Sequence, residues 1–474
     1  MRLVLLFSLL SFQVSAQLSD SLVFNAFYSL VMRNHPVAKQ AALLPEMARS
    51  EIRSARGAFD PILQTELRGK TTKGDESYTY LQPQLKMATR LGVELKAGMD
   101  QSSGPAISRE YAKIDPTTNL PVVANYQLLY AGVNVPLLRG MFTDQRRTEL
   151  QKAKLVLQMN EAEQVKEINK LFLKAAKEFW SWQAAYARNQ LMKKNLDLAE
   201  NRLSFIRNRI LGGEEKPIDS VEALVEYRRR EALLKESELD LRNAVLELSN
   251  YLWDDDGNPI QLPFSMRPSE IGMERVLISA DSLGTLVRGV DELHPEVQKF
   301  RVKLQQARVE RKLSAENLKP QLNVEYYPFQ TYTNTKQDVV PGLFEKNYKF
   351  GLSFYSSLFL RKERGKFQLT GLKIRDAELD LKQGRRELSN QVIIAYNELE
   401  NWKQLLEIQD DLVKNARWMR EAEETRFEAG ESSLFLVNQR ERALIEAQVK
   451  QVELNAKYAS AKYQLQFASG RRLW

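Results

Sequence analysis

The sequence contains no cysteine, only two histidines, and no apolar run of about 20 residues that could form a membrane-spanning helix. Without cysteine there is no disulfide framework, no thiolate metal site and no acylated cysteine to anchor a lipoprotein. A phosphate-binding glycine loop and a His-Glu cluster with metal-ligand spacing are missing as well. The sequence therefore predicts no enzyme, no cofactor and no metal site.

Glycine and proline are scarce, and neither occurs between positions 140 and 212. From about Arg139 to Leu211 this stretch predicts a single helix about 105 Å long, at 1.5 Å per residue. Its apolar residues step by three and four, as at Val165, Ile168 and Phe172, so the helix must pack sideways against other long helices. Taken alone, the stretch also fits a simple coiled-coil spacer.

A surface of one charge sign is missing too. The net charge is +8 and 27% of the residues are charged, yet both signs alternate along the predicted helices, as in Lys166-Glu167. We interpret these charges as solvated helix faces, and we expect no nucleic-acid partner.

The first residues predict export from the cytoplasm. A basic start at Met1-Arg2, an apolar core from Leu3 to Leu10 and small residues at 14–16 describe a secretory signal peptide over residues 1–16. We expect the mature chain to begin at Gln17. Its place is then either the periplasm, as a soluble protein, or the outer membrane, as strands.

Two regions, 61–136 and 320–357, change from a period near 3.6 to a period of 2. In the first, Leu63, Thr65 and Leu67 alternate with polar residues; in the second, Leu322 and Val324 do so. Each run has about the 9–11 residues that a tilted membrane strand needs.

The order of helix, strands, long helix and return helix occurs twice, which indicates an internal repeat. His35-Pro36 and His294-Pro295 stand at matching places in the two copies, so we interpret both histidines as structural residues of a turn that precedes a helix. The predicted parts are a first repeat over 17–253, with strands in 61–136 and a long helical hairpin over 139–253; a connector over 254–293; and a second repeat over 294–474, with strands in 320–357 and a hairpin over 360–469.

Strands interrupted by such long helices predict a channel. Only closed β-barrels are stable in an outer membrane, because every backbone polar group must be paired there. The strands of one chain are too few to enclose a wide pore, so several copies must share one barrel. The alternative is a soluble β-sandwich attached to a helical stalk.

The strand pair from Tyr78 to Asp100 leaves the number of strands per chain open at four or six. It either widens the barrel or stands outside the membrane as a separate hairpin, and we favour the separate hairpin.

The signal peptide, the duplicated unit and the helix ends 209–213 and 426–430 resemble TolC-type outer membrane efflux proteins. The resemblance implies a mainly α fold with a β-barrel part, in which a homotrimer forms a channel-tunnel of transmembrane strands and long helical hairpins. It also implies two partners, a periplasmic adaptor protein that binds the hairpin tips and an inner-membrane transporter of the RND or ABC type. Substrates cross unchanged.

The resemblance identifies the hairpin tips as candidate adaptor-docking and gating surfaces. The first copy keeps acids after its tip glycine, whereas Leu436 and Gln439 occupy the places where TolC has acids, which puts a charged gate there in doubt. Asp219 and Glu222 could instead form a carboxylate ring, or could be ordinary acids near a helix N-terminus. The candidate residues are Arg209, Gly212, Gly213, Asp219, Glu222, Arg426, Gly430, Leu436 and Gln439.

The expected function is that of a passive exit duct in the outer membrane, with its helical tunnel in the periplasm, serving a tripartite efflux or type I secretion system. The alternative is a periplasmic helical scaffold or adaptor that conducts nothing.

Overall fold

The computed structural model describes residues 21–72, 75–103, 117, 126–213, 216–269, 280–332 and 348–472. The predicted signal peptide over 1–16 lies outside the described residues. The chain divides into two compact units: unit 1 consists of Met1–Leu43, Gln164–Pro295 and Arg385–Trp474, and unit 2 of Leu44–Glu163 and Glu296–Gly384. Each unit takes segments from both predicted repeats, and the two repeats stay a prediction from the sequence.

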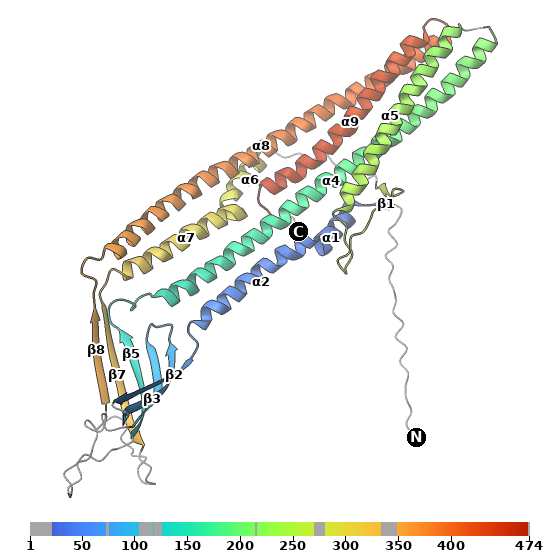
Figure 1. The fold of residues 1–474 in the computed structure, drawn as a ribbon. Coiled ribbons are helices and arrows are strands. Elements are labelled where there is room, and N and C mark those ends of the chain that lie inside the picture. The colour runs from blue at the N-terminus through green and yellow to red at the C-terminus, as the bar shows by residue number, and fades with distance from the viewer. Residues whose placement is uncertain are drawn as a thin grey trace, which may run out of the picture. The chain divides into compact units, whose positions relative to one another are not determined.

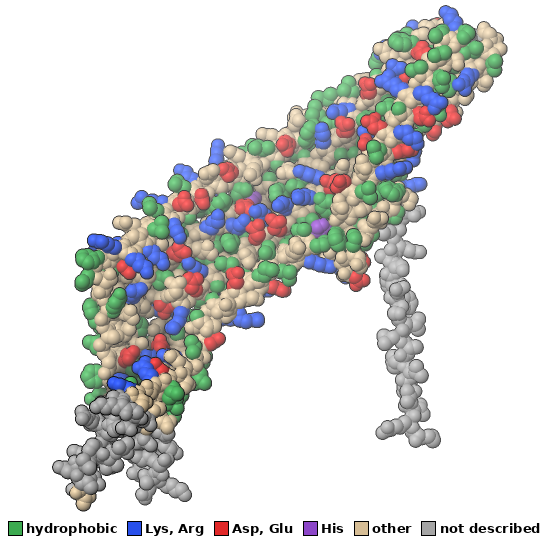
Figure 2. Space-filling view, in the orientation of Figure 1, with side chains coloured by type: hydrophobic (Ala, Val, Ile, Leu, Met, Phe, Trp, Pro, Cys, Tyr) green, Lys and Arg blue, Asp and Glu red, His purple; other side chains and the backbone are tan. Residues whose placement is uncertain are grey.

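Two long helical hairpins are present, as expected (Figure 1). The first joins α4 (Gln145–Leu211, 67 residues) to α5 (Pro217–Ser249), and the second joins α8 (Arg361–Glu428, 68 residues) to α9 (Leu434–Ala468). On the face drawn in Figure 2, basic and acidic side chains interleave over the helices, in agreement with the sequence pattern. Within the described residues, no helix has both the length and the apolarity to cross a bilayer.

Helix α4 begins later than the predicted Arg139, because a turn precedes it. Gly140 has a φ of +92°, a conformation that interrupts a helix. Asp144 then caps the helix, since its Oδ1 accepts a hydrogen bond from the Arg147 backbone N–H at 2.8 Å.

Shorter elements complete the chain: β1 (Ser21–Leu22), α1 (Phe24–Asn34), α2 (Pro36–Gly57), β6 (Arg267–Pro268), α6 (Ala280–Leu293) and α7 (Pro295–Glu316). The β1 strand pairs in parallel with β6, which lies in the predicted connector, and this two-residue ladder could not be read from the sequence.

The core of unit 1 is apolar and aromatic. Phe27 and Val31 of α1 pack in one buried cluster with Trp182 of α4 and Leu248 of α5, all of them almost completely buried. The predicted helix seam thus faces neighbouring helices. Burying such large side chains gives about 1.5–3 kcal/mol each, which holds the helices together sideways.

His35 has the structural role expected from its place before a proline. Its Nδ1 accepts a hydrogen bond from the Val37 backbone N–H at 3.1 Å, at the start of α2. Burial lowers the pKa of the His35 ring, which keeps the accepting nitrogen free of a proton at neutral pH. His294 is also buried, and a side chain at Gly470 would collide with its ring.

Unit 2 contains one antiparallel sheet of six strands in the order β2-β3-β4-β5-β7-β8. The strands are β2 (Ile62–Thr72), β3 (Asp75–Ala88), β4 (Glu94–Ser103), β5 (Tyr126–Pro136), β7 (Gln321–Tyr332) and β8 (Tyr348–Tyr355).

Our favoured interpretation of residues 78–100 as a separate hairpin is wrong. These residues form β3 and β4, and the two strands lie inside the sheet between β2 and β5. Backbone pairing explains this position: β3 forms a ladder with β2 and β4 forms one with β5, so the hairpin satisfies the polar groups of both neighbours.

The sheet has one apolar and one polar face. Leu63 pairs with Leu85, Leu85 with Ala97 and Ala97 with Ala131, so these apolar residues share a face across four strands. On β7 and β8 the same face carries Val324 opposite Leu352, Tyr326 opposite Phe350, and Leu322 opposite Phe354. The opposite face carries Gln84, Lys96, Asp100, Asn134, Glu325 and Lys349.

Candidate docking and gating site

Both hairpin tips close on a glycine in the left-handed conformation. Gly213 has a φ of +79° and Gly430 a φ of +76°, and no atom lies within 4 Å of the place where either would carry a Cβ. The glycines are therefore required by the backbone and not by a lack of space. Gly212, by contrast, continues the α4 hydrogen bonding, since its N–H reaches the Asn208 carbonyl at 3.1 Å.

The second tip is a complete Schellman motif. The Gly430 N–H donates to the Phe427 carbonyl at 3.0 Å, and the Glu431 N–H donates to the Arg426 carbonyl at 2.9 Å. The first tip repeats the inner bond, from the Gly213 N–H to the Ile210 carbonyl at 3.0 Å.

Arg209 and Arg426 occupy the same backbone position, four residues before the tip glycine in each hairpin. Their surroundings differ. The Arg209 guanidinium lies over the Phe205 ring, 5.5 Å from its centroid, whereas Arg426 Nη1 lies 3.8 Å from a carboxylate oxygen of Glu423. The two arginines thus share a backbone position relative to the tip glycine, while the contacts described for their side chains differ.

The two acids after the first tip have separate partners. Asp219, in the first turn of α5, accepts a hydrogen bond from the Lys216 backbone N–H at 3.2 Å and so caps its own helix. Glu222 accepts a hydrogen bond from the Asn438 amide of α9 at 3.1 Å and so joins the two hairpins.

Leu436 and Gln439 lie on the exposed side of the first turns of α9, while their neighbours Val437 and Asn438 are buried. Ser433 caps this helix by accepting a hydrogen bond from the Leu436 backbone N–H. The tip of the second hairpin therefore presents an apolar and an amide side chain to solvent, and neither of these two positions carries a charge.

A buried apolar cluster brings the two tips together. Leu203 and Ile206 of α4 pack with Ala223 of α5 and Leu434 of α9, and Phe427 of α8 packs against them. The predicted tip residues of both hairpins consequently belong to one site within unit 1.

Sequence reasoning missed a largely buried arginine–glutamate network near the tips, which is made of Arg202, Glu226, Arg230, Glu441 and Arg442. Arg230 is 3% exposed, and its Nε lies 3.2 Å from Glu226 Oε1. Its Nη1 donates to the Asn195 carbonyl at 3.1 Å, and its Nη2 pairs with Glu441.

The same network joins three helices. Glu441 of α9 also pairs with Arg202 Nη1 of α4 at 2.6 Å, and Glu226 of α5 accepts two hydrogen bonds from Arg442 of α9. Burial alone would raise the pKa of the Glu441 carboxyl, but Arg202 and Arg230 outweigh it and hold that pKa below its usual range. The one signal in the sequence is the spacing of Glu226 and Arg230 by four residues, which is common on any charged helix.

Glu423 of α8 binds two residues that follow the turn of the second hairpin, Ser432 and Arg440. Its Oε1 accepts a hydrogen bond from the Ser432 hydroxyl at 2.5 Å, and its Oε2 lies 3.6 Å from Arg440 Nε. The hydrogen bond from Ser432, helped by the charges of Arg426 and Arg440, lowers the pKa of Glu423 against the opposing effect of desolvation.

Residues 287–471 match the family described as outer membrane efflux protein. No curated protein sequence matches the chain.

Solved structures that are similar in fold include three from different bacteria. The Campylobacter jejuni CmeC outer membrane channel matches with a TM-score of 0.62 and 13% identity, covering 94% of this chain and 85% of that chain. A membrane protein from Pseudomonas aeruginosa matches with a TM-score of 0.67 and 14% identity over 94% and 92% of the two chains. The open state of the Neisseria gonorrhoeae MtrE outer membrane channel matches with a TM-score of 0.62 and 12% identity over 94% and 88%.

These comparisons confirm the resemblance to outer membrane efflux proteins and the expected fold of long helical hairpins with a strand part, while the trimer stays an expectation. The matched family and the matched channels are not enzymes. They support the outer-membrane location and the export role that the resemblance implies.

Proposed function

We propose that this chain, whose residues 287–471 match the outer membrane efflux protein family and whose fold is that of outer-membrane channels, is a passive exit duct. It would carry substrates across the periplasm and the outer membrane for a tripartite efflux or type I secretion system. The substrates pass unchanged, with no catalysis and no cofactor.

One observation carries this proposal, the division of the six-stranded sheet into an apolar and a polar face. An apolar outer face is what lipid requires of a barrel wall, and a polar inner face is what a water-filled lumen requires. On β8, the side chains of Phe350, Leu352 and Phe354 are each at least 67% exposed in the single chain. Lipid and neighbouring strands would cover them in the assembled wall.

Identical copies must supply the rest of the barrel. Within the described residues, β2 pairs only with β3 and β8 pairs only with β7, so the sheet ends in two open edges. An open edge is not stable in a bilayer. A homotrimer, as the family match supports, would close the wall by pairing β8 of one copy with β2 of the next.

The hairpin tips would bind a periplasmic adaptor, which couples the duct to an inner-membrane transporter of the RND or ABC type. Supporting this, Leu211, Ile218 and Phe435 lie at the tips and are each more than 55% exposed, although they are large and apolar. Gly213, Gly430, Arg209 and Arg426 shape these tips, and Gly212, Leu436 and Gln439 belong to the same docking surface.

Gating would occur where the two hairpins touch. Asp219 and Glu222 already have partners within the chain, so we assign them to helix capping and to the contact between hairpins. Opening would then separate Glu222 from Asn438 at the tip ends of α5 and α9, while Arg442 stays bound to Glu226 farther from the tips.

Membrane fractionation tests the proposal. After a carbonate wash of cell envelopes, a duct stays in the outer-membrane pellet, and a strain lacking the gene becomes sensitive to exported compounds. A protein that is released into the wash and leaves export unchanged would instead be a periplasmic scaffold or adaptor, which is the alternative function.

A further inference from the structure

We propose that the hairpin formed by β3 and β4 is part of the barrel wall, so that each copy contributes six strands and the pore is wide enough for bulky hydrated cargo. This inference rests on the proposed duct function. A threefold assembly would then contain about 18 strands, six from each copy, in place of about 12 if the hairpin stood apart.

Backbone pairing places the hairpin in the wall. The β2–β3 ladder runs from Ile62 opposite Lys86 to Thr72 opposite Asp75, and the β4–β5 ladder runs from Glu94 opposite Asn134 to Ser102 opposite Tyr126. The β3 strand has 14 residues and β4 has 10, enough for a tilted strand to cross a bilayer. Without the hairpin, β2 would lose its partner over residues 62–72 and β5 would lose β4 over residues 126–134.

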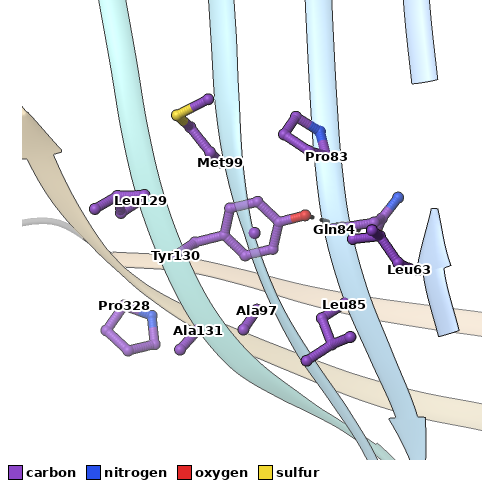
Figure 3. A pocket seen from close by; sticks show the side chains of 11 residues that line it. Leu63, Pro83, Gln84, Leu85, Ala97, Met99, Leu129, Tyr130, Ala131 and Pro328 are labelled. Carbon is purple, nitrogen blue, oxygen red and sulfur yellow. Dashed lines mark hydrogen bonds between the residues drawn. The ribbon is translucent and has the colours of Figure 1, made fainter. Parts of the chain in front are cut away.

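The apolar face continues across most of the hairpin and is interrupted only near its far end, where Gln101 lies opposite Leu81. Leu81, Leu85 and Leu95 carry it between Leu67 on β2 and Val133 on β5. A hollow of about 480 Å³ lies in this part of the sheet and is lined by residues of five strands, from Leu63 on β2 to Pro328 on β7. Figure 3 shows the side chains that line it. A hairpin that stood apart in water would not need an apolar face aligned with the apolar faces of β2 and β5.

On the polar face, side chains link the hairpin to strands beyond its neighbours. Lys96 of β4 reaches across β5, so that its Nζ lies 3.0 Å from the Tyr327 hydroxyl and 3.5 Å from Glu325 Oε1. Within the hairpin, the Gln82 amide donates to Asp100 Oδ1 at 2.6 Å. These contacts form a polar lining on the side that would face the lumen.

Two glycines are matched to two tyrosines on this lining. A Cβ at Gly98 on β4 would lie 2.8 Å from the Tyr130 hydroxyl oxygen, and a Cβ at Gly132 on β5 would lie 2.2 Å from Tyr327 Cδ1. The two tyrosine rings meet edge to face, with centroids 5.8 Å apart. The absence of a side chain at Gly98 on β4 thus makes room for Tyr130 on β5, as expected if the two strands are always paired.

The turn between β3 and β4 is fixed at the end of the sheet from which the helices leave. The Thr89 N–H donates to the Val93 carbonyl at 2.9 Å, and Gly92 takes a φ of +90°. A Cβ at Gly92 would lie 3.0 Å from the Gly140 carbonyl oxygen, so the turn rests on the segment between β5 and α4.

Wall size follows from strand number. With strands about 4.8 Å apart and tilted by about 40°, a wall of about 18 strands has a backbone diameter of about 36 Å, against about 24 Å for about 12 strands. The barrel would then pass hydrated cargo too broad for the narrower wall.

Cysteine scanning tests the inference, because the chain has no cysteine of its own. Single variants on β4, Leu95→Cys, Ala97→Cys and Met99→Cys on the apolar face and Lys96→Cys and Asp100→Cys on the polar face, are reacted in outer membranes with a water-soluble maleimide. The matched controls on β7 are Val324→Cys on the apolar face and Glu325→Cys on the polar face. Only protein that remains in the outer-membrane fraction is scored.

We expect polar-face thiols of β4 to react at least about tenfold faster than apolar-face thiols, since lipid excludes the reagent and disfavours the reactive thiolate. The β7 pair should differ in the same way. If the reaction rate alternates along β7 but is uniform along β4, the hairpin lies in water. The inference is then wrong, while the proposed duct function is unaffected. If β7 also reacts uniformly, the sheet is not in lipid, and the proposed function fails together with the inference.

Discussion

Arg442 binds Glu226 through two hydrogen bonds, with its Nε 2.9 Å and its Nη2 2.7 Å from the same carboxylate oxygen, and thereby joins α9 to α5. Behind this contact lies the buried pair of Arg230 and Glu441. Separating the hairpins would leave buried charges without partners, which is costly. We therefore expect the arginine–glutamate network to hold the hairpins together while the residues between the network and the tip glycines rearrange.

The first prediction concerns the Glu441→Gln variant. It removes the carboxylate that pairs with Arg202 and Arg230, and breaking a buried ion pair in this way should lower the free energy of unfolding by about 3–5 kcal/mol. Denaturant unfolding of the detergent-solubilised protein, followed by helical circular dichroism, measures the effect. The control is Glu238→Gln in the exposed pair with Lys235, where we expect less than about 1 kcal/mol. Equal losses in the two variants would contradict a special role for the network.

The second prediction concerns pH. The folded-state pKa of Glu441 lies below its unfolded value of about 4.3, so the pair contributes its stability above that value and loses it as the pH falls through the lower folded pKa. The stability difference between the parent protein and Glu441→Gln should therefore be constant at neutral pH and shrink below about pH 4. Unfolding midpoints of both proteins between neutral and acidic pH give the result. A difference that persists unchanged in acid would argue against an ionised Glu441.

The third prediction concerns the tip. Gly430→Leu places a side chain on a backbone with a φ of +76°, which should cost about 1–2 kcal/mol locally and distort the Schellman turn. We expect impaired dye export with normal membrane assembly. Gly365→Ala inside α8, where a Cβ also meets nothing, is the control and should leave export intact while adding about 0.5–1 kcal/mol of stability. Undiminished export by Gly430→Leu would remove the tip from the functional site.

The fourth prediction concerns the sheet. Gly132→Ala would push a methyl group into the Tyr327 ring, and we expect assembly into the outer membrane to fall sharply because the ring and strand cannot both keep their places. Gly351→Ala on the same face meets its nearest atom, Glu325 Cβ, at an ordinary 3.7 Å and should assemble normally. The amount of each variant in washed outer membranes is the readout. Equal amounts would mean that Tyr327 does not lie over Gly132.

The helical part of the fold could be predicted from the sequence because its signals are local. Phe179 and Trp182 fall on one seam by spacing alone, and both are buried. The tip glycines could be predicted for a similar reason, since Gly213 and Gly430 follow a basic last turn and are followed within a few residues by a new helix.

The position of β3 and β4 could not be predicted in the same way. Alternation along a strand indicates which residues share a face, but the partner strand is set by contacts far apart in sequence, such as Lys96 with Glu325. The arginine–glutamate network could not be predicted for the same reason. In the sequence Arg230 is one of many charged helix residues, and only the packing of α9 brings Glu441 next to it. Non-local pairing is the information that the sequence pattern lacks.

The central claim is that several copies of this chain form one lipid-embedded duct. Electron microscopy of the protein extracted in mild detergent and placed in lipid discs tests it most directly. We expect threefold particles with a continuous lumen, a strand region inside the disc and a helical region projecting from it. A monomeric particle that stays in solution without detergent and never enters the discs would contradict the account.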